Sequence, residues 1–165
     1  MYSKIIKRIF DFCVALLATP FVLIVIAVFA PLIWLTDRGS VFYNAERIGK
    51  DGKRFKMFKL RSMYENSPDI RNSDGSTFNS SCDVRVTPIG NFLRKTSLDE
   101  IPQILNVLLG DMSFVGPRPT VGQKKLNEIP EHDRIRYRVR PGITGYAQAY
   151  YRNSIDQYLK YDYAT

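Results

Sequence analysis

Two adjacent carboxylates, Asp99 and Glu100, are the residues of this chain best suited to chemistry. They come at the predicted start of a helix, with Ser97 or Asp99 as the N-cap and Gly110 as the stop. The positive end of a helix dipole favours both ionised carboxylates and a bound phosphate. An ionised Asp can be a covalent nucleophile, and a neighbouring Glu can hold a metal ion. Acidic residues are also common in first turns, so position alone leaves a purely structural role open.

The elements that must position this pair begin with an apolar stretch, residues 12–35, which carries no charge and is long enough to span a bilayer. Pro20 removes an N–H group and predicts a bend, which the hydroxyl of Thr19 can make tolerable in lipid. Basic residues flank both ends, and the positive-inside rule places both flanks in the cytoplasm. A helix bent at Pro20 satisfies that rule by entering and leaving through one leaflet. The residues alone leave a re-entrant and a spanning helix both open.

A β-hairpin is predicted next, because residues 41–48 and 54–62 flank the turn residues 49–52. In the second strand Lys59 and Arg61 share one face. That face is either a cationic part of a site or an ordinary solvated strand face.

Three further features concern possible anion sites. Thr87 and Pro88 predict a helix start, with Arg94 near the end of that helix. Arg118 lies between two prolines, and a stiff loop presenting one guanidinium suits phosphate binding, although a surface turn is the competing interpretation. Residues 131–140 contain four arginines and form either an amphipathic helix on anionic headgroups or a solvated basic face.

Composition and missing motifs limit the function. The 165 residues are enough for one packed domain. The net charge of +8 indicates an anionic partner such as a phospholipid surface, a nucleotide or a nucleic acid. The chain has no D-x-D, P-loop, dinucleotide-binding or H-E-x-x-H motif, which removes support for the enzyme classes that use them. Two cysteines and one solvated histidine predict neither a zinc site nor a disulfide framework.

The predicted fold is therefore α+β and mainly helical. A re-entrant membrane helix-break-helix over residues 1–38 precedes a cytosolic, interfacial catalytic domain over residues 39–165, which holds the hairpin and amphipathic helices at the membrane interface. Residues 64–82 read as a mobile loop. A last helix opens at residues 154–157 and reaches the end of the chain without a stop signal, so we expect the C-terminus to be truncated.

Several runs in this order resemble the bacterial sugar transferases, also called monotopic phosphoglycosyl transferases. The runs are F-K-L-R-S-M at 58–63, D-V-R-V-T-P-I-G at 83–90, F-L-R-K-T-S-L-D-E-I-P-Q at 92–103, N-V-L at 106–108, G-D-M-S at 110–113, V-G-P-R-P at 115–119 and R-P-G-I-T-G at 140–145. Thr19-Pro20 stands where the family has Ser-Pro at the membrane bend.

The resemblance implies an enzyme at the cytoplasmic face of the bacterial inner membrane. Such enzymes move a phosphosugar from a UDP-sugar to polyprenol (undecaprenyl) phosphate, release UMP and initiate capsule, O-antigen, exopolysaccharide or glycoprotein glycan synthesis. Asp99 matches the nucleophile that holds the phosphosugar, and Glu100 matches the residue that binds Mg²⁺. The positions matching donor contacts are Lys59, Arg61, Arg85, Arg94 and Arg118.

The expected partners are thus the donor, the lipid acceptor and the phospholipid membrane, and not nucleic acid, because the apolar segment argues against it. Oligomeric state is open, with a homodimer as one option. No spacing identifies the sugar, and residues 146–153 are where sugar contacts are expected. A phosphatase that uses the same Asp and metal with water, and a non-enzymatic basic membrane adaptor, are the rival functions.

Overall fold

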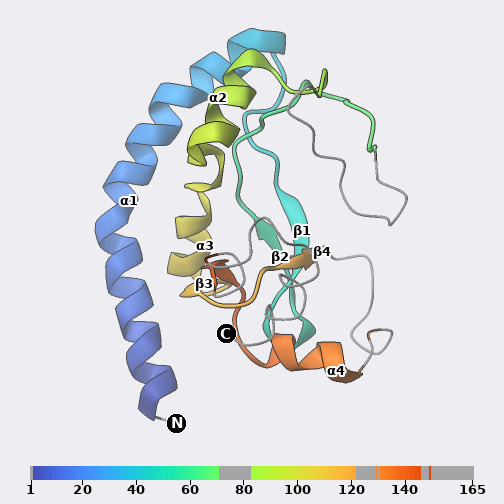
Figure 1. Ribbon diagram of the computed structural model, residues 1–165. Coiled ribbons are helices and arrows are strands. Elements are labelled where there is room, and N and C mark those ends of the chain that lie inside the picture. The colour runs from blue at the N-terminus through green and yellow to red at the C-terminus, as the bar shows by residue number, and fades with distance from the viewer. Residues whose placement is uncertain (1, 71–82, 122–128, 130, 146–148, 150–165) are drawn as a thin grey trace.

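The protein is a mixed helix-and-strand structure dominated by one long N-terminal helix (Figure 1). The computed structural model describes residues 2–70, 83–121, 129, 131–145 and 149. The helices and 3₁₀ turns are α1 (Tyr2–Asp37), η1 (Lys50–Gly52), α2 (Pro88–Thr96), η2 (Leu98–Glu100), α3 (Gln103–Leu109), α4 (Glu131–Arg134) and η4 (Ile135–Arg138). The strands are β1 (Ala45–Ile48), β2 (Arg54–Met57), β3 (Ser113–Val115), β4 (Thr120–Val121) and β5 (Gly142–Thr144).

Helix α1 lies along one side of the rest of the protein and buries only a narrow stripe. The buried apolar members of that stripe are Ala15, Val22, Val25 and Ile33, which follow helical spacing. Large apolar side chains exposed elsewhere on the helix include Phe10, Leu17, Phe21, Ile24 and Leu35. The stretch Ile5–Asp37 is long and apolar enough to cross a membrane, and only 17% of its most apolar part is buried in the protein. A core helix of a soluble protein would bury much more of its surface.

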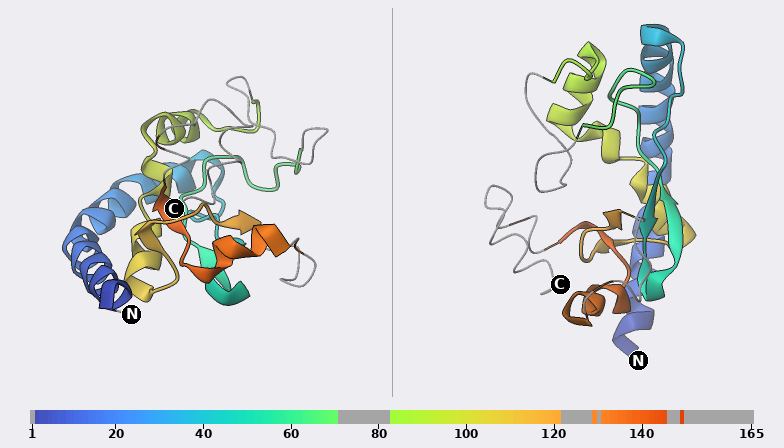
Figure 2. Two further views of the ribbon diagram at one scale, coloured as in Figure 1. Left: turned by 60° about the horizontal axis from the view of Figure 1, so that its bottom comes forward. Right: turned by 90° about the vertical axis from the view of Figure 1, so that its right-hand side faces the viewer.

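The helix does not break at Pro20, contrary to the helix-break-helix prediction. Helical structure continues through Pro20 and Pro31 over 36 residues, along a curved path (Figures 1 and 2). The Thr19 hydroxyl donates to the Ala15 carbonyl at 2.8 Å, as the sequence suggested. One missing backbone hydrogen bond bends a helix without ending it, and the Thr19 hydroxyl bonds within the turn that precedes the proline. The re-entrant arrangement in a membrane stays a prediction.

Both ends of α1 are tied to the same globular part. Near its start, the buried Asp11 carboxylate accepts from the Ser113 hydroxyl of β3 at 2.7 Å and pairs with Lys7 at 3.2 Å. At its end, the Asp37 carboxylate accepts hydrogen bonds from both terminal nitrogens of Arg61, each at 2.5 Å. Helix α1 is therefore anchored at two separated points and not at one hinge.

The start of α1 also caps the end of α3. The Arg8 guanidinium donates to the carbonyls of Val107 at 2.7 Å and Leu108 at 3.2 Å, and Arg140 donates to the carbonyl of Gly110 at 2.7 Å. Cations at the negative end of a helix satisfy carbonyls that lack partners within the helix.

The predicted hairpin is confirmed, although its regular ladder is shorter than residues 41–48 and 54–62. Strands β1 and β2 pair antiparallel from Ala45↔Met57 to Ile48↔Arg54, and the Phe42↔Leu60 bridge continues the same register. Strand β4 pairs with the other edge of β1, so the sheet order is β2-β1-β4. Strands β3 and β5 form a separate parallel pair.

The local signals around α2 and α3 had mixed outcomes. Thr87 is the N-cap of α2, and its hydroxyl accepts from the Gly90 N–H at 2.9 Å, as predicted. Gly110 ends α3 with a φ of 95°, also as predicted. The N-cap prediction of Ser97 or Asp99 is wrong, because α3 begins at Gln103. Ser97 has a φ of 58° as the C-cap of α2, and an N-cap needs an extended backbone instead.

The basic segment, residues 131–140, does not form one long amphipathic helix but a short helix followed by a 3₁₀ turn. Helix α4 and turn η4 follow one another over residues 131–138. Tyr137 of η4 is buried and packs in a cluster with Ile48 and Ile129, so this side of the segment packs against protein. Most of the predicted loop at 64–82, the predicted last helix and all but one of residues 146–153 lie outside the described residues.

Candidate active site

The acidic pair lies at the junction of η2 with the strand that continues β2. Asp99 is buried, with 2% of its surface exposed. The Lys59 ammonium is 2.9 Å from Oδ2 of Asp99 and 3.2 Å from Oε1 of Glu100. The Leu60 N–H donates to the Asp99 carbonyl at 2.9 Å, which fixes η2 against this strand. One cation therefore bridges both carboxylates, and solvent screens its interaction with the buried Asp99 less than that with the more exposed Glu100.

A second contact, made by Asn106 of α3, sets the path of the strand that carries Lys59. Asn106 is fully buried, and its amide nitrogen donates to the Lys56 carbonyl at 2.8 Å. Its amide oxygen accepts from the Phe58 N–H at 2.9 Å. Strand β2 is at the edge of its sheet, so Asn106 bonds to that strand much as a neighbouring strand would. The position of Lys59 thus depends on α3.

An open cleft lies beside the acidic pair. It is lined by Arg47, Met57, Glu100, Gln103, Arg118, Pro119, Gly142 and Ile143. Glu100 reaches this cleft, whereas Asp99 is covered beneath Lys59 and is absent from the lining. The cleft therefore presents one carboxylate and two guanidinium-bearing side chains next to a buried carboxylate.

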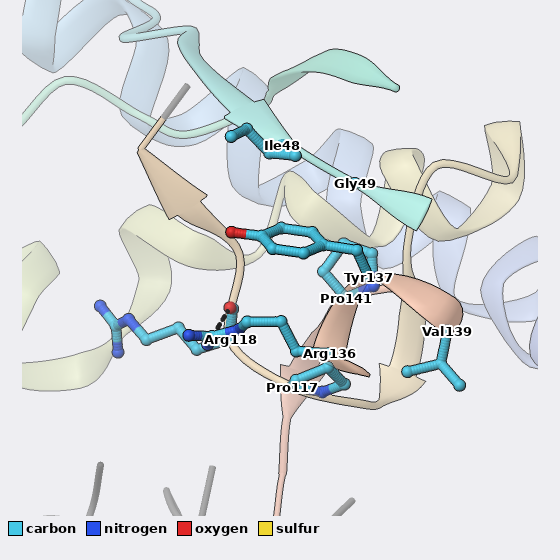
Figure 3. Close-up of a pocket in the computed structure, with 8 residues that line it drawn as sticks. All are labelled: Ile48, Gly49, Pro117, Arg118, Arg136, Tyr137, Val139 and Pro141. Carbon is cyan, nitrogen blue, oxygen red and sulfur yellow. Dashed lines mark hydrogen bonds between the residues drawn. The ribbon is translucent and has the colours of Figure 1, made fainter. Parts of the chain in front are cut away.

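A neighbouring hollow shares Arg118 with this cleft (Figure 3). The Tyr137 ring lies in it between Ile48 and Arg118, and the Tyr137 hydroxyl bonds to Thr120 at 2.7 Å. Arg136 donates to the Arg118 carbonyl at 3.0 Å, which holds the backbone of the proline-flanked loop. The Arg118 side chain is exposed on this loop, which fits both the phosphate-binding and the surface-turn interpretation.

The other predicted cations are held by the protein itself. Arg61 pairs with Asp37, and Arg94 donates to the Ser62 hydroxyl at 2.8 Å. Arg85 donates to the Asp83 carboxylate at 2.6 Å, and these hydrogen bonds lower the pKa of Asp83 from 3.8 to about 2. The structure thus places Lys59 on both Asp99 and Glu100, and Arg118 in the cleft that Glu100 lines. It gives Arg61 and Arg85 acidic partners, and their contact with a donor stays a prediction.

The residues present fit a magnesium ion whose remaining ligands come from the phosphates of a bound substrate and from water. The described part of the chain contains no group of three or more His, Cys, Asp or Glu side chains able to enclose a metal. Mg²⁺ commonly uses only one or two carboxylates, with substrate phosphates and waters as its other ligands. Glu100 lines the cleft and is 36% exposed, and its carboxylate shares the Lys59 ammonium with that of Asp99. Glu100 can therefore supply such a ligand.

Asn106 and Gln103 are site residues that the sequence reading missed. A signal was present, because Asp99, Gln103 and Asn106 are polar and spaced i, i+4 and i+7 in a run whose other residues, apart from Glu100, are apolar. All three side chains are buried. Polar residues at helical spacing in an apolar segment mark a buried polar face.

Comparisons with known proteins identify relatives of this chain. The family model described as "Bacterial sugar transferase" matches residues 2–164. A Bacillus subtilis protein provisionally named an undecaprenyl-phosphate N-acetylgalactosaminyl 1-phosphate transferase is 48% identical over 76% of this chain and 69% of its own length. The UDP-glucose:undecaprenyl-phosphate glucose-1-phosphate transferase of Escherichia coli is 40% identical over 88% of this chain. The UDP-N-acetylgalactosamine-undecaprenyl-phosphate N-acetylgalactosaminephosphotransferase of Aeromonas hydrophila is 40% identical over 92%. The match covers only 31% and 35% of the lengths of these last two proteins.

Proposed function

This chain belongs to the bacterial sugar transferase family, and from that membership we propose that it transfers a phosphosugar from a UDP-sugar to undecaprenyl phosphate. The observation that carries the proposal is the buried Asp99 carboxylate, neutralised by Lys59 and placed beside a cleft that contains Glu100 and Arg118. A nucleophile, cations for a diphosphate and an exposed apolar helix for a lipid substrate are what this reaction needs.

In the proposed reaction, an oxygen of Asp99 attacks the sugar-bearing phosphorus of the donor, and the bond from that phosphorus to UMP breaks. An oxygen of the lipid phosphate then attacks the same phosphorus and releases Asp99. Lys59 and Arg118 reduce the repulsion between the carboxylate and the anionic donor. Mg²⁺ at Glu100 would neutralise further phosphate charge. Because Lys59 covers Asp99, its ammonium must move aside from the attacking oxygen as the donor binds.

The anchoring of α1 supports a monotopic arrangement at the cytoplasmic face of the membrane. The Asp11 and Asp37 ends of the helix both bond to the same globular part. A helix that crossed the bilayer would place those ends on opposite sides. We therefore infer that α1 enters and leaves through one leaflet, with its exposed apolar side chains in lipid and the acidic pair near the headgroups.

The nucleophile is tested with donor alone. Wild-type protein in detergent should form a phosphosugar adduct on the peptide that contains Asp99 and release one UMP for each adduct. Asp99→Asn should form no adduct, whereas Asp51→Asn, at an exposed turn residue, should behave as wild type. Ping-pong kinetics should follow when the lipid is added. Sequential kinetics without an adduct would refute the covalent route, and continuous donor hydrolysis without lipid would indicate a hydrolase.

The membrane topology is tested by labelling. Single cysteines introduced at Ser3 and Ser40, in a background lacking Cys13 and Cys82, should both react only with a reagent on the cytoplasmic side. Labelling of the Ser3 position from the opposite side would show that α1 spans the bilayer.

A further inference from the structure

Gln103, the first residue of α3, carries a buried side-chain amide. It is only 4% exposed. Among the residues that the structure describes, its side chain makes no hydrogen bond to the protein. Asn106, one turn later on the same helix, is equally buried and has both ends of its amide bonded. Because buried polar groups in folded proteins are almost always paired, the Gln103 amide, unpaired within the described part of the chain, is available to a polar group of a ligand.

Gln103 borders the candidate site. Gln103 lines the cleft together with Glu100 and Arg118. It also follows Asp99 by only four residues, at the point where α3 begins after the turn η2 that holds the proposed nucleophile. A ligand whose phosphorus is attacked by Asp99 would therefore bring its nearest substituents to Gln103.

We propose that Gln103 binds the sugar of the donor, through a hydroxyl or acetamido group next to the reacting phosphate. This inference rests on the proposed function. A primary amide both donates and accepts hydrogen bonds, as does a hydroxyl or acetamido group, whereas an ionised phosphate only accepts. The cleft already holds guanidinium-bearing side chains suited to phosphate. The sugar is bonded directly to the attacked phosphorus, whereas the uracil is separated from it by a second phosphate and a ribose.

The test compares Gln103→Met, which keeps length and removes the amide, with Asn91→Leu at an exposed amide on α2. For Gln103→Met, kcat/KM for the accepted UDP-sugar should fall about tenfold, as for one lost hydrogen bond. The inhibition constant of UDP, which lacks the sugar, should stay within about twofold of the wild-type value. The melting temperature without ligand should equal or exceed that of wild type, because an unsatisfied buried amide has been removed.

Three results would overturn the inference. A clear fall in the ligand-free melting temperature would mean that the amide has a structural partner. An equal loss of UDP affinity would place the contact on the diphosphate or nucleotide. An unchanged kcat/KM would mean that no contact exists. If wild type turns over no UDP-sugar, the proposed function fails, and calorimetric binding of UDP-sugar relative to UDP by both proteins still tests Gln103.

Discussion

The two hydrogen bonds of Asn106 predict a large and specific loss of stability on its replacement. Asn106→Leu keeps the number and branching of the side-chain heavy atoms but removes the bonds to Lys56 and Phe58, which measure 2.8 and 2.9 Å. The position is fully buried, so water cannot replace the lost partners. Each backbone group left unsatisfied costs about 1–3 kcal/mol, which gives a total of roughly 2–6 kcal/mol. Because the freed strand leads to Lys59, activity should fall as well.

The assay is urea unfolding in detergent, followed by circular dichroism, with Asn91→Leu as the matched control. Asn91 is an exposed asparagine on α2, and its replacement should change the free energy of unfolding by no more than about 0.5 kcal/mol. For a chain of this length each kcal/mol corresponds to about 2–4 °C in melting temperature. The reasoning is refuted if the two variants are equally stable, because β2 would then not depend on this amide.

Three further predictions concern the metal, a helix cap and acid stability. Chelation by EDTA should stop turnover, and Glu100→Gln should raise the Mg²⁺ concentration needed for half-maximal rate; full activity in metal-free buffer would exclude this role. Thr87→Ala should lower the free energy of unfolding by about 1 kcal/mol in urea titrations, because the cap bond to Gly90 is lost. The pKa of Asp83 is lowered from 3.8 to about 2, so its bond to Arg85 contributes stability above the unfolded-state pKa and loses it as the pH falls toward 2. The stability gap between wild type and Asp83→Asn, measured at a series of pH values, should therefore close between about pH 4 and pH 2.

Signals confined to a few neighbouring residues were the ones that could be predicted. The hairpin, the Thr87 cap and the Gly110 stop each depend on a local pattern, and each was found. The cap assigned to Ser97 failed because the tight connection from α2 to η2 gives that residue a left-handed backbone. Such a connection depends on how the two elements pack, which a capping pattern does not encode.

The partners of the arginines differ in how far they lie along the chain. Arg85 pairs with Asp83, two residues away, and a pair this close along the chain could have been predicted from the sequence. Arg61 pairs with Asp37, which is 24 residues away and reaches it only when α1 packs against the strand that follows β2. The acidic site itself was predicted from the Asp99-Glu100 pair, but its Asn106 support depends on contacts 48 and 50 residues distant.

The double anchoring of α1 limits how this helix can move relative to the rest of the protein. A single membrane helix usually adapts to bilayer thickness by changing its tilt. Here Asp11 and Asp37, 26 residues and about 39 Å apart along the helix, are each bonded to the globular part. Helix α1 cannot tilt without breaking one of these contacts or carrying the whole protein with it. In the one-leaflet arrangement proposed above, α1 and the acidic pair are therefore expected to move relative to the lipid together, as one body.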